Sequence, residues 1–146
     1  MKVLTSSKPN MKKLEEFLES QTLLPLSFNF ASSDDHIGTH LTGIFPKRPF
    51  HVAQGVYPKK GWLKLNLWEG FVDPKEHPRM YDPAEGFIVS ANSIIASKYC
   101  KNGITHGFSF THRYLRLREI LMEKMKNGGK LHIDDMIEAQ MDTLDY

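Results

Sequence analysis

Cysteine is almost absent from this sequence: Cys100 is the single example among 146 residues. One cysteine excludes an intrachain disulfide and every zinc site built from several cysteines. It leaves the compartment open, since many secreted proteins also lack disulfides. Cys100 lies between Tyr99 and Lys101, and no histidine is evidently placed as its partner. We therefore interpret it as an incidental thiol and not as a nucleophile.

An excess of charge of one sign is also missing, because 19 lysines and arginines face 17 acids and leave a formal charge of +2. So weak a field gives no reason to expect nucleic acid or an anionic membrane as a partner. No apolar run approaches the length of a transmembrane helix, and the start, MKVLTSSKPN, is too polar for the core of a signal peptide. We expect a soluble chain whose localisation the sequence does not indicate.

The first third of the chain predicts a helix followed by a β-hairpin, within residues 11–46. MKKLEEFLES, residues 11–20, places its apolar side chains at helical spacing. The apolar and polar residues of LPLSFNFASS then alternate with the period of a half-buried strand. The run IGTHLTGIFP, residues 37–46, is β-rich, and the short polar link between the two runs favours an antiparallel hairpin.

Residues 47–84 predict a long irregular loop, because prolines, glycines and both tryptophans interrupt every period. A connection of this length in a compact domain is usually either a functional loop or a segment that packs against a larger protein. Its aromatic side chains favour packing over disorder.

The last part predicts one buried strand and two helices. GFIVSANS lies within residues 85–93 and predicts a strand that ends at Asn92. Residues 111–145 predict two amphipathic helices, separated at NGG, where a glycine suits a helix end. Together with the hairpin, these elements predict an α+β fold in one domain.

Histidines and paired acids give no convincing metal or acid–base site. His36 and His40 are four residues apart in a β context, where such side chains do not converge as they do on a helix. The acid pairs at 34–35 and 134–135 are typical of a turn and of a helix start.

Asn92 and Arg113 are the two side chains that stand out. Asn92 breaks the apolar run, and its simplest interpretation is a turn residue, since asparagine tolerates left-handed backbone. Arg113 lies in the first turn of a predicted helix, where a cation opposes the helix dipole and so needs a partner elsewhere. One turn later comes Leu117 of the apolar stripe, so Arg113 is placed to direct its guanidinium toward a carboxylate or amide.

The order and spacing of several motifs resemble one known family. They are PAEGFIVSAN, which fits P-x-x-G-[FY]-I-x-x-x-N, the arginine-led HRYLRLREILMEK, and LHIDDMIEAQMD. The chain resembles an internal part of the β chain of the penicillin acylase (penicillin amidase) family of N-terminal nucleophile hydrolases. The resemblance covers about residues 14–145 and leaves residues 1–10 as an unmatched tail.

The resemblance implies a four-layer αββα sandwich, of which this chain is a part, and hydrolysis of linear amides. Acylated amines, β-lactam side chains and acylhomoserine lactones are the substrate types implied. Asn92 matches the asparagine that helps to hold the oxyanion, and Arg113 matches an arginine that organises the active site. No cofactor is implied for the chemistry, although a structural calcium ion is possible in the complete protein.

One departure from the family concerns the nucleophile. Residue 1 is Met, no serine, threonine or cysteine stands at a processed junction, and the Gly38–Thr39 pair falls inside the hairpin. We therefore expect residues 1–146 to be a single fragment, inactive alone, whose partners are the α chain and the nucleophile-bearing part of the β chain. Members of the family are often exported. The alternative is a free-standing, non-catalytic binding or structural module.

Overall fold

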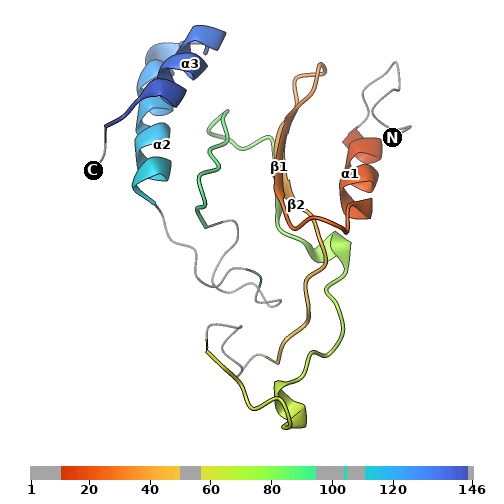
Figure 1. The fold of residues 1–146 in the computed structure, drawn as a ribbon. Helices are drawn as coiled ribbons and strands as arrows, with labels where there is room; N and C mark the ends of the chain where they lie inside the picture. Colours follow the sequence, from red (N-terminus) through yellow and green to blue (C-terminus); the bar gives the residue numbers. More distant parts are fainter. Residues whose placement is uncertain (1–10, 50–56, 95–103, 105–110, 145–146) are drawn as a thin grey trace. The chain divides into compact units, whose positions relative to one another are not determined.

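The computed structural model describes residues 11–49, 57–94, 104 and 111–144. The chain forms two compact units. Unit 1 comprises Met1–Ile88 and Ile95–Gly107, and unit 2 comprises Val89–Ile94 and Phe108–Tyr146. The described residues contain a three-stranded antiparallel sheet and three α-helices (Figure 1). The α+β class is confirmed at this level. Among the described residues, no helix has the length and apolar character needed to cross a bilayer.

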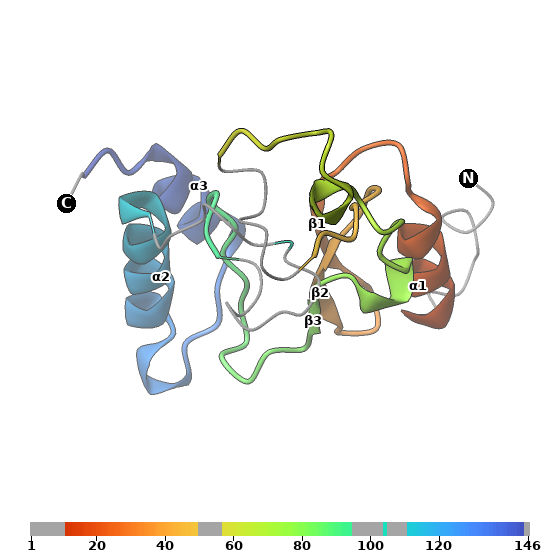
Figure 2. The same ribbon diagram turned by 90° about the horizontal axis from the view of Figure 1, so that it is seen from below.

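The sheet of unit 1 contains the predicted hairpin. β1 (Ser27–Ala31) lies beside β2 (Ile37–Leu41) (Figure 2). The two strands pair antiparallel, with Phe30 opposite Gly38. Asp35 lies in the turn with φ of 66°, a left-handed conformation that aspartate tolerates better than most residues. The hairpin prediction is confirmed, but β2 ends at Leu41 and does not continue to residue 46.

A third strand lies in the segment for which the sequence predicted only a loop. β3 (Arg79–Tyr81) pairs antiparallel with β2, and two 3₁₀ turns, η1 (Lys64–Asn66) and η2 (Pro74–Glu76), precede it. The prediction of a wholly irregular 47–84 segment was therefore wrong. Three residues are too few to show an alternating pattern. In addition, the preceding Pro78 contributes only its carbonyl, which accepts the N–H of Leu41 at 3.0 Å.

The predicted N-terminal helix is present as α1 (Met11–Ser20). Leu18 is 3% exposed and supplies its buried contact. Glu15 and Glu19 lie one turn apart, and a carboxylate oxygen of each is 3.2 Å from Nη1 of Arg79 in β3. An apolar contact and an ion-pair network therefore hold α1 in unit 1.

Gly43 occupies a position that no other residue fits. Its φ is +112°, and a Cβ built there would lie 2.7 Å from the Cα of Pro25. We expect Gly43→Ala to destabilise the chain by about 2–4 kcal/mol, because backbone strain and a clash with backbone add together. Denaturant unfolding measures the change. Gly70→Ala (φ +111°, open space) should cost less, and Gly61→Ala (open space) least; equal effects at the three sites would contradict this explanation.

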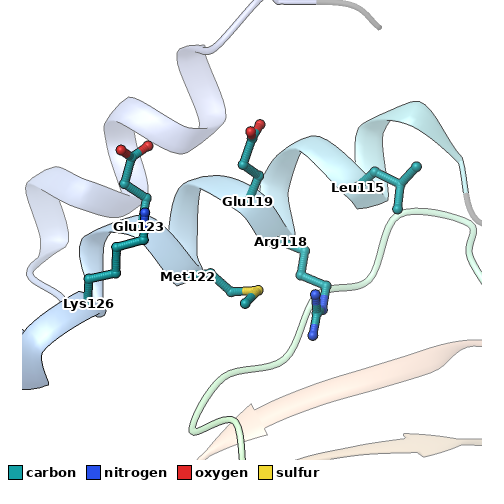
Figure 3. Close-up of a pocket in the computed structure, with 6 residues that line it drawn as sticks. All are labelled: Leu115, Arg118, Glu119, Met122, Glu123 and Lys126. Carbon is teal, nitrogen blue, oxygen red and sulfur yellow. The ribbon is translucent and has the colours of Figure 1, made fainter.

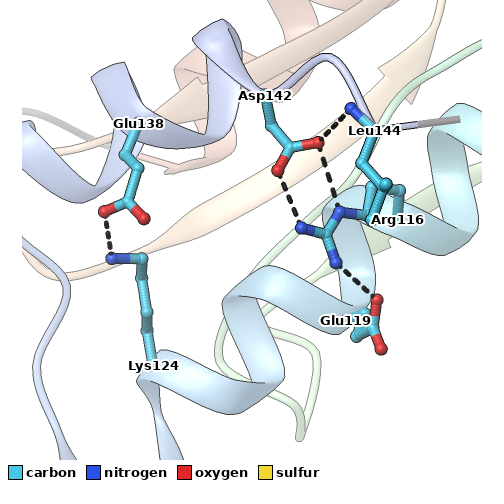
Figure 4. A network of polar contacts seen from close by, with 6 residues as sticks. All are labelled: Arg116, Glu119, Lys124, Glu138, Asp142 and Leu144. Carbon is cyan, nitrogen blue, oxygen red and sulfur yellow. Dashed lines mark hydrogen bonds and ion pairs between the residues drawn. The ribbon is translucent and has the colours of Figure 1, made fainter.

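Unit 2 contains both predicted C-terminal helices. α2 (His112–Lys124) is followed by the 3₁₀ turn η3 (Lys126–Gly128) and by α3 (Ile133–Met141). Ion pairs join the two helices: Nζ of Lys124 lies 2.7 Å from Glu138, and the guanidinium of Arg116 pairs with Asp142 (Figure 4). The prediction of two helices within residues 111–145 is confirmed.

His132 at the start of α3 is a weak capping residue by type, and a carboxylate compensates for it. Oδ2 of Asp135 accepts the backbone N–H of His132 at 2.7 Å. This bond is the largest cause that lowers the pKa of Asp135, followed by the bond from Lys124. Asp135 therefore stabilises the first turn and binds α2 at the same time.

The predicted strand over 85–93 does not form. Residues 85–94 have no strand assignment, and the boundary between the two units falls after Ile88. An apolar, β-prone run becomes a strand only when a neighbouring strand exchanges ladder hydrogen bonds with it, and the described residues supply no such neighbour. Asn92 lies in an irregular segment and not at the end of a strand.

Candidate functional site

Asn92 forms a left-handed turn with its side chain directed outward. Its φ is 53°, whereas Ala91 and Ser93 on either side are each only 5% exposed. Asparagine adopts this conformation at lower cost than most residues. The two buried neighbours fix the backbone of the turn, and the carboxamide of Asn92 is left exposed.

Arg113 lies in the first turn of α2, where its cation was expected to need a partner, and the structure shows a hydrogen-bond partner for it. Its Nη2 donates a hydrogen bond of 2.6 Å to Oδ1 of Asn92. Because a guanidinium only donates, it fixes which end of the carboxamide faces it. The Nδ2 group of Asn92 then points away from Arg113, with both N–H bonds available to an acceptor. Among the described residues, no hydrogen bond from Nδ2 is found.

Thr111 joins the Asn92 turn to α2, a role that was not predicted from the sequence. Its hydroxyl donates to the carbonyl of Ala91 at 2.9 Å and accepts the N–H of Tyr114 at 3.2 Å. The available signal was a threonine directly before a predicted helix, a favoured N-cap. The bond to Ala91 had no sequence signal, since the two residues are twenty positions apart.

A cavity of about 270 Å³ adjoins Arg113 within unit 2. Its wall combines apolar and charged side chains from the turn, from α2 and from the end of α3. The lining residues are Ser90, Ala91, Arg113, Arg116, Leu117, Ala139, Gln140, Asp142 and Leu144. Arg113 therefore lines a half-open hollow of mixed polarity, and Ala91, the neighbour of Asn92, lines it too.

Arg116 is held differently from Arg113, although both lie on the same side of α2. Its Nη2 and Nε donate to the two carboxylate oxygens of Asp142 at 2.7 and 3.2 Å, and Nη1 donates to Glu119 at 2.8 Å (Figure 4). The bond from Arg116 is the main cause that lowers the pKa of Asp142. Two carboxylates thus bind Arg116, whereas Arg113 binds a neutral amide.

A larger hollow, of about 360 Å³, lies along another face of α2 (Figure 3). Among the described residues, α2 and the following turn line it, through Leu115, Arg118, Glu119, Met122, Glu123 and Lys126. Because none of these six residues is placed as a nucleophile or base, we do not assign chemistry to this hollow.

The structure describes the partners of His36 and His40. Nδ1 of His36 lies 2.8 Å from Oδ2 of Asp82, and Nδ1 of His40 lies 2.8 Å from the hydroxyl of Tyr81. The two rings therefore serve different partners. In the part of the chain that is described, no cluster of three His, Cys, Asp or Glu side chains could hold a metal ion. Cys100 lies outside the described residues.

His40 and His77 are buried in unit 1, at 0% and 4% exposure. Nδ1 of His77 bonds to the carbonyl of Leu41 at 3.1 Å, and within the described residues Nε2 of each ring has no partner. Burial is the largest cause that lowers the pKa of both rings below the ordinary value of 6.5. Both are therefore neutral in the folded chain near pH 7.

Acid is expected to destabilise unit 1 through these two rings. The pKa of each buried ring is lower in the folded chain than in the unfolded chain. Its contribution to the free energy of unfolding is therefore complete above the unfolded value of 6.5 and is lost as the pH falls toward the folded value. His36 has the opposite sign, since its pKa is raised by Asp82, but its side chain is 42% exposed and the effect is smaller. Denaturant unfolding at about pH 7.5 and about pH 5.5 should give a lower free energy of unfolding at the lower pH.

Two variants control this experiment. His77→Gln should lose part of the pH dependence, and His112→Gln, which changes an exposed residue of α2, should retain it. Stability that is unchanged or greater at the lower pH would contradict the role given to the buried rings.

Comparison with known proteins finds a family and several relatives that are similar to this chain in sequence. The penicillin amidase family model matches residues 5–146. The acyl-homoserine lactone acylase QuiP of Pseudomonas syringae pv. syringae is 30% identical over 137 residues, covering 94% of this chain and 16% of its own length. The QuiP acylase of Pseudomonas putida is 35% identical over 125 residues, covering 86% and 14%.

A relative named for a different activity also matches. Penicillin acylase 2 proenzyme of Pseudomonas sp. (strain SE83) is 27% identical over 108 residues, which cover 74% of this chain and 13% of the relative. The chain therefore spans about 16% of the length of the first curated relatives that it matches.

Proposed function

Because this chain belongs to the penicillin amidase family, we propose that it is part of a hydrolase that cleaves linear amide bonds, in which Asn92 stabilises the oxyanion and Arg113 orients Asn92. The observation that carries the proposal is the bond of 2.6 Å from Arg113 to Oδ1 of Asn92. This bond leaves a carboxamide donor exposed at a turn that buried neighbours fix in place.

The chemistry needs a donor where negative charge develops. When a nucleophile attacks an amide carbonyl, its oxygen becomes an anion in the tetrahedral intermediate, and a fixed N–H donor stabilises this charge more than it stabilises the ground state. Nδ2 of Asn92 is such a donor. The bond from the Arg113 guanidinium draws electron density toward Oδ1 and so strengthens donation from Nδ2.

The other parts of the reaction belong to the rest of the protein. The nucleophile, its base and the backbone N–H that completes the oxyanion hole come from other segments, so residues 1–146 alone are inactive. The complete protein forms an αββα sandwich, and its remainder covers apolar side chains that are exposed here, such as Leu23 at 93% and Trp62 at 80%. The proposed chemistry requires no cofactor.

The substrate carries an acyl group on a neutral amide nitrogen. The relatives are named as acyl-homoserine lactone and penicillin acylases, which favours acylhomoserine lactones and acylated amines as the first substrates to test. The protein that contains this chain should release one carboxylic acid and one amine from each such amide. Purified protein that releases neither product from any of these amides would contradict the proposal.

A second candidate is the non-catalytic module, and one observation favours it. The φ of 53° at Asn92 explains an asparagine without any chemistry, because few other residues adopt this backbone conformation readily. Asn92→Gly separates the two functions. Glycine suits the turn equally well, so this change should leave the fold of a non-catalytic module unaffected. In a hydrolase the same change should abolish the activity.

A further inference from the structure

The side chain of Thr111 bonds both to the Asn92 turn and to the start of α2. Its Oγ1 donates to the carbonyl of Ala91, directly before Asn92, and accepts the N–H of Tyr114, directly after Arg113. The Thr111 hydroxyl therefore holds one backbone neighbour of Asn92 and one backbone neighbour of Arg113. The hydroxyl has one proton and gives it to Ala91, so its two bonds do not compete.

We propose that Thr111 is a positioning residue for the Asn92 carboxamide, and this inference depends on the function proposed above. A long arginine side chain reaches Asn92 at 2.6 Å only while the turn and the helix start keep their separation. Thr111 fixes that separation through two bonds to backbone atoms, which have little freedom of their own. Without the hydroxyl, the hydrogen bond from Arg113 to Asn92 is the one polar link between the turn and the start of α2 that remains among the described residues.

Three substitutions separate the roles of Thr111. Thr111→Ser keeps a hydroxyl that donates and accepts in the same way, and serine is at least as good an N-cap as threonine. Thr111→Val keeps the branched shape but removes both bonds. Because losing the cap costs about 1 kcal/mol or more of helix stability, Thr111→Gly serves as a second variant: glycine caps about as well as threonine and has no hydroxyl.

The first measurement is made on the chain itself and needs no activity. The heteronuclear NOE of the Nδ2 group of Asn92 reports whether the carboxamide is held, and Asn29 in β1 provides an internal reference. We expect a high NOE for the natural chain and for Thr111→Ser, and a low one for Thr111→Val and Thr111→Gly, with Asn29 unchanged. Far-UV circular dichroism records whether α2 is retained.

The second measurement is amide hydrolysis by the protein that contains this chain. Thr111→Val and Thr111→Gly should lower kcat about tenfold with KM nearly unchanged, and Thr111→Ser should restore kcat, because the loss concerns the transition state. A KM effect alone would contradict the inference.

Three results of the measurements on the chain itself would also overturn the inference. The first is an ordered Asn92 carboxamide in Thr111→Val and Thr111→Gly with α2 intact. The second is loss of α2 in both variants, which would assign Thr111 to helix stability alone. The third is failure of Thr111→Ser to restore the Asn92 signal. None of these depends on catalysis, so a failure of the hydrolase proposal, seen as hydrolysis that is indifferent to Asn92→Ala, is distinguished from a failure of this one.

Discussion

Asn92→Ala is expected to lower kcat for amide hydrolysis by about a hundredfold to a thousandfold while KM changes little. The removed donor acts on charge that exists only in the transition state, and loss of one such donor in other enzymes has this magnitude. The measurement is steady-state kinetics of the protein that contains this chain, with an acylhomoserine lactone or an acylated amine as substrate.

Two further substitutions at this position separate the donor from the turn. Asn92→Asp keeps an acceptor for Arg113 and tolerates the left-handed backbone, but its carboxylate donates no hydrogen bond. Asn92→Gly suits a φ of 53° without strain. Both variants should fold and both should be as impaired as Asn92→Ala. Near-normal kcat in either one would remove Asn92 from the catalytic site.

Arg113→Met should lower kcat about tenfold to a hundredfold. Methionine retains part of the aliphatic length of arginine but gives Oδ1 of Asn92 no donor, and a hydrogen bond to a charged group is worth about 1.5–3 kcal/mol. The carboxamide then rotates freely and presents its oxygen to the oxyanion for part of the time. The same kinetic assay measures this loss.

Arg118→Met is the matched control for Arg113→Met, because Arg118 lies on the same helix but lines the hollow on the other face. Its kcat should stay within about twofold of that of the unaltered protein, as expected for a surface substitution away from the site. An equal loss in both variants would mean that removing any cation from α2 impairs the protein, and would contradict the specific role of Arg113.

The elements that the sequence predicts well are those whose pattern is local. α1, α2 and α3 each carry an apolar stripe at helical spacing, and the β1–β2 hairpin combines alternation with a short turn. β3 and the 85–93 segment show the limits of such patterns. A three-residue strand is created by its neighbour, and an apolar run without a neighbouring strand stays irregular, so both outcomes depend on pairing that no local pattern records.

For the candidate site, too, local features can be predicted from the sequence and long-range contacts cannot. Residue type and position draw attention to Asn92, an amide that breaks an apolar run, and to Arg113, a cation at the unfavourable end of a helix dipole, but their site roles were implied by the family resemblance. Their hydrogen bond joins residues 21 positions apart and is visible only in the structure. Thr111 was missed because its cap is common, whereas its bond to Ala91 depends on the path of the intervening chain.

A double-mutant cycle on Asn92 and Arg113 tests most directly whether the guanidinium acts through the carboxamide. With kcat measured for Asn92→Ala, Arg113→Met and the double variant, we expect Arg113→Met to have no further effect once Asn92 is alanine. Independent losses that multiply in the double variant would show that Arg113 acts on something other than Asn92 and would contradict the account.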